Sequence, residues 1–241
     1  MQLFRINSPN YNKNLRVKSN IKFLIIHYTG MQSKRASFER LVSVKHKVSC
    51  HYLVDRNGKV FQFVSDNRIS WHAGKSKWKN FKNLNNKSIG IELVNKGHSF
   101  GYEKFSKKQI DKLLTLCLFL KKKYKINNSC ILGHSDIAPL RKIDPGEKFP
   151  WKKLSKKGVG LWYFNAKKNF ENLKKTEIRN IFFKNLYKIG YRYFNKNKSS
   201  SSDSAVVKAF QRRYVQNKVD GKIDLKMLKI SHYLAKKSKI T

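Results

Sequence analysis

Residues 133–146 read Gly133-His134-Ser135-Asp136-Ile137-Ala138-Pro139-Leu140-Arg141-Lys142-Ile143-Asp144-Pro145-Gly146, and this stretch indicates both a fold and a chemistry. It places an imidazole and a carboxylate ten positions apart, with a lysine two positions before the carboxylate. A second imidazole, His27, follows the apolar run 21–26, which predicts a buried strand. Two histidines and an aspartate can form an open three-ligand zinc site, since catalytic zinc keeps a fourth position for water. The pattern therefore predicts a hydrolytic metal centre.

Four ordered segments carry a resemblance to a known family. They are residues 25–30 (IIHYTG), residues 50–58 (CHYLVDRNG), residues 70–74 (SWHAG) together with 88–93 (SIGIEL), and the loop 133–146. In this order they resemble the family 2 N-acetylmuramoyl-L-alanine amidases, zinc amidases related to the peptidoglycan-recognition proteins, and most closely the AmiD type. The resemblance covers roughly residues 20–151. Four blocks with their own flanking patterns are far more specific than a lone set of two histidines and an aspartate.

The resemblance implies that His27, His134 and Asp144 bind one catalytic zinc ion. It also implies the reaction: hydrolysis of the amide bond between N-acetylmuramic acid and L-alanine in peptidoglycan and muropeptides, in cell-wall turnover or recycling. Zinc would lower the pKa of a bound water to about 7 and polarise the amide carbonyl. The alternative is a protein that recognises peptidoglycan without cutting it, as relatives do when a ligand is missing.

Two further positions take catalytic roles by the same resemblance. Glu92 falls on the family's catalytic acid, and a carboxylate that does not bind the metal can move a proton from water to the leaving amine. Lys142 falls beside the scissile carbonyl, where an ammonium stabilises charge that develops in the transition state. His72 is expected to line the substrate groove. Cys50, where relatives often carry a tyrosine, receives no catalytic role.

Each of these residues also has an ordinary structural interpretation. A histidine at the end of an apolar strand, such as His27, is more often an interior group with its hydrogen bonds satisfied than a ligand. Asp144 before Pro-Gly is typical of a turn. Glu92 in an apolar strand could belong to a structural ion pair, because a buried carboxylate is costly unless it is paired or functional. For His72, packing is nearly as good an explanation as substrate binding.

Lysine and arginine total 54 against 14 acidic residues, which gives a formal charge of +40. Such a charge normally suggests nucleic acid or an anionic surface. However, 43 of these cations are lysines and only 11 are arginines, and the lysines are spread along the whole chain. Specific recognition of phosphates and bases favours arginine. We therefore expect compositional bias rather than a specific nucleic-acid partner, and peptidoglycan and muropeptides as the ligands.

Three cysteines without a CxxC pair predict no disulfide framework. No stretch approaches about 18 continuous apolar residues, so no membrane span is expected. The first residues lack the features of a signal peptide, which favours the cytoplasm, whereas a wall-binding tail favours the cell envelope. We expect a monomer.

The first domain, residues 1–165, is predicted to have an α/β fold in which helices flank a mixed central β-sheet. Predicted strands cover residues 21–26, 51–55, 59–64, 88–94 and 130–132, and predicted helices cover 33–47 and 106–125. Asn57-Gly58 between two β-rich runs predicts a hairpin. Because strands alternate with helices, an α/β architecture is favoured over segregated strands and helices.

The second domain, residues 166–241, is predicted to be a small bundle of three helices. The predicted helices cover 177–189, 205–214 and a segment that follows Asp224 and reaches about residue 235. Residues 205–214 (AVVKAFQRRY) and 219–224 (VDGKID) resemble the three-helix peptidoglycan-binding domain. A domain this small buries little apolar surface, so we expect it to dock on the first domain.

Overall fold

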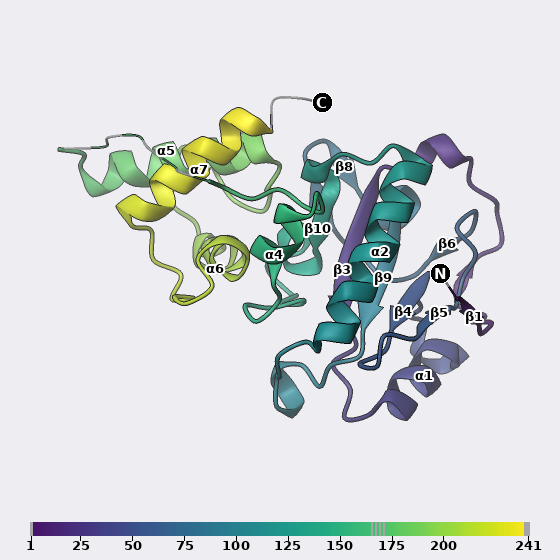
Figure 1. The fold of residues 1–241 in the computed structure, drawn as a ribbon. Helices are drawn as coiled ribbons and strands as arrows, with labels where there is room; N and C mark the ends of the chain where they lie inside the picture. Colours follow the sequence, from purple (N-terminus) through teal and green to yellow (C-terminus); the bar gives the residue numbers. More distant parts are fainter. Residues whose placement is uncertain (1, 165, 167, 169, 171, 239–241) are drawn as a thin grey trace.

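A mixed six-stranded sheet forms the centre of the computed structural model, which describes residues 2–164, 166, 168, 170 and 172–238 (Figure 1). Its strands, in spatial order, are β1 (Phe4–Arg5), β5 (Val60–Gln62), β4 (Tyr52–Val54), β9 (Ser88–Leu93), β3 (Phe23–Tyr28) and β10 (Ile131–Gly133). Only β4 and β5 pair antiparallel, and the other four pairings are parallel. The predicted mixed sheet is confirmed.

The central strand β3 is apolar and buried as predicted, but it lies two residues further along the chain than expected. Its pairing with β9 continues through His27, which lies opposite Glu92, and Tyr28, which lies opposite Leu93. This ladder of main-chain hydrogen bonds keeps His27 inside the strand instead of after it. The imidazole is therefore held by a strand and not by a loop.

The predicted hairpin is confirmed in β4 and β5. Asp55 and Lys59 close it with a main-chain hydrogen bond of 2.9 Å. Gly58 has a φ of +86°, a conformation that side chains disfavour, so the turn explains the glycine at this position.

Helix α2 (Lys107–Tyr124) crosses one face of the sheet (Figure 1). The Ser106 hydroxyl caps it by accepting from the amide of Gln109 at 3.1 Å, and Ile110, Leu113 and Leu120 are buried. Helix α1 (Lys34–Val42) is shorter than predicted. After Ser43 the chain forms only a 3₁₀ turn, η2 (Val44–His46), because Val44 is exposed and has no core to pack against.

Several short elements were not predicted. They are β1, β2 (Tyr11–Asn12), β6 (Ile69–Ser70), β7 (Lys77–Trp78), β8 (Phe81–Lys82), η1 (Lys18–Asn20), η3 (Leu84–Lys87), η4 (His98–Phe100), η5 (Asn128–Cys130), α3 (His134–Ile137) and α4 (Trp151–Lys156). None of them lies within a segment whose pattern indicated a strand or a helix of that kind.

The C-terminal part contains the three predicted helices, α5 (Lys175–Ile189), α6 (Asp203–Tyr214) and α7 (Leu225–Lys237). Helix α7 begins after Asp224, whose carboxylate accepts from the amide of Met227 at 2.8 Å. Helix α6 has no side-chain cap at its N-cap residue, Ser202. In the part of the chain that the structure describes, no helix combines the length and apolar character needed to cross a membrane.

The helical part and the part that contains the sheet share one continuous apolar core. The helical part contributes Phe182 and Phe210 to it, and the other part contributes Ile131 and Trp151. The predicted boundary, at residue 165, lies outside the described residues. The division into two domains stays a prediction.

A buried polar cluster joins the two parts. The carboxylate of Asp136, in α3, accepts from the Tyr191 hydroxyl at 2.6 Å and from Arg213 Nη1 at 2.5 Å. It also accepts from the amide of Gly133 at 2.8 Å, directly before His134. Arg213 donates a further hydrogen bond to the carbonyl of Ile131 in β10 at 3.0 Å. All these side chains are buried, so the helical part is anchored at the end of β10.

Candidate metal centre and active site

Parallel strands β3, β9 and β10 end at the same edge of the sheet, and the predicted site lies there. His27 comes from the end of β3, and Glu92 lies opposite it on β9. His134 follows β10 directly and begins α3. The loop after α3 returns Asp144, whose carbonyl accepts from the amide of Ser135 at 2.9 Å. Each predicted ligand is therefore placed by main-chain hydrogen bonds.

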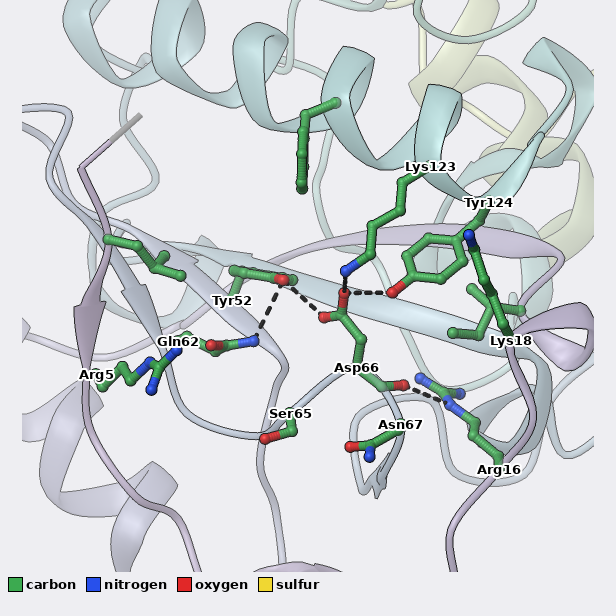
Figure 2. Close-up of a pocket in the computed structure, with 13 residues that line it drawn as sticks. Arg5, Arg16, Lys18, Tyr52, Gln62, Ser65, Asp66, Asn67, Lys123 and Tyr124 are labelled. Atoms are coloured by element: carbon green, nitrogen blue, oxygen red, sulfur yellow. Dashed lines mark hydrogen bonds and ion pairs between the residues drawn. The ribbon is translucent and has the colours of Figure 1, made fainter.

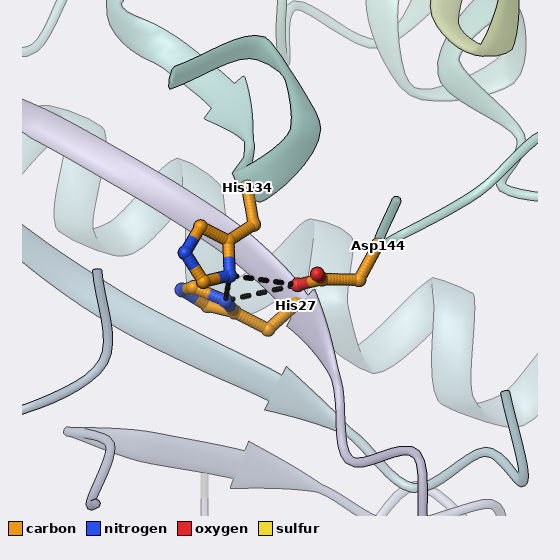
Figure 3. Close-up of side chains that lie close together, drawn as sticks. All are labelled: His27, His134 and Asp144. Atoms are coloured by element: carbon orange, nitrogen blue, oxygen red, sulfur yellow. Dashed lines mark hydrogen bonds and ion pairs between the residues drawn. The ribbon is translucent and has the colours of Figure 1, made fainter. Parts of the chain in front are cut away.

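The three predicted ligands converge on one point (Figure 3). The two Nδ1 atoms of His27 and His134 lie 3.0 Å apart, and each is 3.1 Å from Asp144 Oδ2. Tetrahedral zinc with bonds of about 2.0–2.1 Å requires ligand atoms roughly 3.3 Å apart. The spacing and the donor types fit a zinc ion, with one side left for water or substrate.

The charges of these groups also suit a cation. Burial lowers the pKa of His27 to about 4, so its ring is neutral. Burial acts to raise the pKa of Asp144, but the adjacent His134 and His27 rings outweigh it and hold that pKa well below its usual range. A neutral imidazole and an ionised carboxylate are the forms that bind metal.

Glu92 and Lys142 face the same cavity, which has a volume of about 540 Å³. Among the described residues, Glu92 Oε2 is buried without a hydrogen-bond partner. Burial raises the pKa of Glu92 to about 8, the Asp144 carboxylate adds to this increase, and the Lys142 ammonium opposes it. A carboxyl group poised near neutral pH and free of partners is suited to moving protons.

His72 also borders this cavity, but it is only 9% exposed. Its Nδ1 lies 3.0 Å from Nε2 of His27, so the ring contacts a candidate ligand. Its Nε2 lies 3.1 Å from the hydroxyl of Ser88.

Sequence reasoning did not find three residues around this site. The carbonyl of Ala73 lies 3.1 Å from Nε2 of His134, and the side chain of Asn85 accepts from the amide of Ala73 at 2.6 Å. Asp136 caps the turn that begins with His134. Only Asp136 had a readable signal, because an acidic residue three positions after Gly133 is typical of a helix cap.

A second cavity, of about 460 Å³, lies at the other end of the parallel strands, beside Ile21 and Tyr52 (Figure 2). The carboxylate of Asp66 is its central acidic group. It accepts hydrogen bonds from Tyr52 at 2.6 Å, Lys123 at 2.8 Å and Tyr124 at 2.5 Å. With its acceptor capacity used in this way, Asp66 has a structural role, and the cavity shows no ligand group for a metal among the described residues.

In one cavity at the ends of the parallel strands lie two imidazoles, a carboxylate, a lysine and a glutamate with one oxygen that has no hydrogen-bond partner among the described residues. This arrangement is typical of a hydrolytic enzyme. The family model for N-acetylmuramoyl-L-alanine amidases matches residues 17–147, and the chain belongs to this family.

Individual relatives agree with this assignment. The chain is 33% identical to the N-acetylmuramoyl-L-alanine amidase AmiD of Escherichia coli over 90% of its own length and 83% of the relative. It is 32% identical to the 1,6-anhydro-N-acetylmuramyl-L-alanine amidase AmpD of Haemophilus influenzae, over 62% of this chain and 88% of that one.

Solved structures show the same fold. A complex of E. coli AmiD with the substrate anhydro-N-acetylmuramic acid-L-Ala-D-γ-Glu-L-Lys aligns with a TM-score of 0.79 and 30% identity over 90% of both chains. AmpDh3 of Pseudomonas aeruginosa aligns with a TM-score of 0.79 and 27% identity over 96% of this chain and 98% of that one. The protein is an enzyme that hydrolyses the amide bond between N-acetylmuramic acid and L-alanine.

Proposed function

We propose that the chain carries out this hydrolysis with one zinc ion held by His27, His134 and Asp144. The observation that carries the proposal is the triangle of donor atoms with sides of 3.0–3.1 Å. When bound, zinc supplies Lewis acidity, which acidifies water and polarises the carbonyl of the substrate. A protein that only recognises peptidoglycan would have no need for the unpartnered Glu92 carboxylate in the same cavity.

The remaining steps fall to Glu92 and Lys142. Glu92 takes a proton from the attacking water and passes it to the nitrogen of L-alanine, which leaves as an amine. The Lys142 ammonium stabilises negative charge on the carbonyl oxygen, a charge that is larger in the transition state than in the substrate. Both side chains border the cavity, as these roles require.

The substrates that we propose are muropeptides with an anhydro or an ordinary muramic end, and intact peptidoglycan. The anhydro end is supported by the substrate in the AmiD complex. Intact peptidoglycan is supported by the resemblance of the tail to a wall-binding domain.

Removal of the metal tests the assignment. We expect the protein to split a purified muropeptide into a muramic sugar and a peptide with a free L-alanine amine, as read by mass spectrometry. A chelator should abolish the reaction because the donors of His27, His134 and Asp144 then have no cation to hold, and added zinc should restore it. Magnesium should not, because it prefers oxygen ligands. Full activity in protein shown to be free of zinc would contradict the proposal.

We further propose that residues 166–241 form a peptidoglycan-binding domain and that the protein is a monomer. The proposal is supported by three helices in the predicted order, and by the resemblance of residues 205–214 and 219–224 to such domains. We also propose that the catalytic part is related to the peptidoglycan-recognition proteins, on the resemblance carried by the four segments within residues 20–151. A second binding site on the polymer would raise the effective concentration of the enzyme at its substrate.

Glycan strands without stem peptides can distinguish the proposed wall-binding site of the tail from the active site. We expect them to compete for binding of the inactive Glu92→Gln protein to sacculi, because they would occupy the tail. They should not inhibit cleavage of small muropeptides by the parent protein. Sedimentation should be measured at 0.15 M and 1 M salt, since the charge of +40 alone could cause adsorption that screening removes. Failure of the strands to compete would refute the second site.

A further inference from the structure

We propose that His72, in the loop of residues 71–74, is a positioning residue that fixes the tautomer and orientation of His27, while the adjacent carbonyl of Ala73 does the same for His134. The inference rests on the proposed function, because it takes these two imidazoles as metal ligands. One short loop would thus prepare both rings for the ion.

The hydrogen bonds around His72 have only one consistent direction. If His27 offers Nδ1 to a cation, its proton is on Nε2, which then donates to His72 Nδ1 at 3.0 Å. His72 in turn carries its proton on Nε2 and donates to the Ser88 hydroxyl at 3.1 Å. That hydroxyl donates to the carbonyl of Leu84 at 2.5 Å. This series of hydrogen bonds ends on a carbonyl, which can only accept. Each proton in the series is therefore assigned to one atom.

The second imidazole is fixed in the same way by the main chain. Nε2 of His134 lies 3.1 Å from the carbonyl of Ala73, which can only accept, and 3.4 Å from Arg141 Nη2, which can only donate. The contact with the carbonyl is the shorter one, so we assign the proton to Nε2. The lone pair of His134 Nδ1 is therefore free on the side of His27 Nδ1 and Asp144. Arg141 also donates to this carbonyl. It donates to the carbonyl of Lys75 at 3.0–3.1 Å as well, and so holds the loop from outside.

The loop is itself held firmly. The side-chain carbonyl of Asn85 accepts from the amides of His72 at 3.1 Å and Ala73 at 2.6 Å. On β9, Gly90 lies directly beneath the His72 ring, and a Cβ at position 90 would collide with that ring. The absence of a side chain at Gly90 thus makes room for His72 next to His27.

A pair of nearly isosteric variants separates the hydrogen bond from the packing. In His72→Asn the side-chain oxygen can take the place of Nδ1 and accept from His27, whereas His72→Leu fills a similar volume without an acceptor. Loss of such a partner typically weakens metal affinity about 10–100-fold. We expect this loss of zinc affinity for His72→Leu, measured by competition with a chelator, and a loss of only a few fold for His72→Asn.

Nitrogen NMR of the imidazoles in the metal-free protein gives a second measurement that does not depend on activity. The parent and His72→Asn should show His27 protonated on Nε2, and His72→Leu should show a mixture of tautomers. The exposed His46→Leu is the matched control and should change neither measurement. Should His72→Leu not fold, Ser88→Ala should show a smaller weakening of the same kind.

The outcomes separate the two proposals. If the parent protein does not bind zinc, the proposed function fails. If the parent binds zinc and His72→Leu binds it equally well with the same tautomer, the positioning role is overturned. Equal losses in His72→Asn and His72→Leu would also overturn it, since packing alone would then explain the effect.

Discussion

Replacement of Glu92 by Gln is expected to leave one zinc ion bound per chain while the rate of amide hydrolysis falls about 10²–10⁴-fold. The amide keeps the size of the carboxylate but cannot take a proton from water. Glu92 contributes no atom to the triangle of donor atoms, so the ion should remain. The rate on a soluble muropeptide and the zinc content, by elemental analysis, should be measured on the same preparation.

The matched control is Glu39→Gln, which changes an exposed glutamate whose partner is Arg35 and should leave the rate unchanged. Stability gives an independent check on the same variant. Burial raises the pKa of Glu92 from 4.5 to about 8, so this carboxyl destabilises the metal-free fold increasingly as the pH rises through that range. Metal-free Glu92→Gln protein should therefore gain stability relative to the parent between these pH values. Full turnover in the zinc-loaded variant would exclude Glu92 as the base.

Replacement of Arg213 by Met is expected to lower the free energy of unfolding by about 3–5 kcal/mol, because it leaves the buried Asp136 carboxylate without its cation. The two side chains lie 2.5 Å apart and both are almost fully buried. Chemical denaturation measures the loss. Adding Asp136→Asn to Arg213→Met should recover part of it, since the unpaired charge is then absent.

The exposed pair of Lys107 and Asp111 provides the contrast. Lys107→Met removes the same kind of interaction at the surface, where water and salt screen the pair, so the free energy of unfolding should change little. If Lys107→Met and Arg213→Met lowered the free energy of unfolding by similar amounts, burial of the Arg213–Asp136 pair would not explain its effect on stability.

The sequence was sufficient to predict the sheet, the main helices and the candidate ligands. His27 and Glu92 belong to strands whose apolar runs are long enough to recognise, and His134 follows the short predicted strand 130–132. The parallel pairing then brings the ends of these strands together. The assignment of the ligands came from the resemblance, because geometry alone left a turn at Asp144 and an ion pair at Glu92 as alternatives.

The supports of the site could not be predicted, for a physical reason. Arg213 and Asp136 are 77 positions apart, and nothing near either one indicates the other. Ala73 acts through its main-chain carbonyl, which every residue possesses. Its role therefore does not require a particular residue type and cannot be recognised in the sequence. Gly90 is ambiguous in a strand, since the close approach of His72 is visible only once the two segments are packed together.

The hydrogen bonds of Arg213 and Tyr191 to Asp136 determine whether this enzyme tolerates truncation or the exchange of its helical part. If the chain were cut before α5, the Asp136 carboxylate would lose two of its three hydrogen-bond donors, Tyr191 and Arg213, and would keep only the amide of Gly133. A chimera that attaches this tail to another amidase needs an acidic residue at the equivalent of Asp136. Without it, Arg213 would be a buried cation with no carboxylate partner. The two parts are thus expected to melt in a single transition and to be interchangeable only as a matched pair.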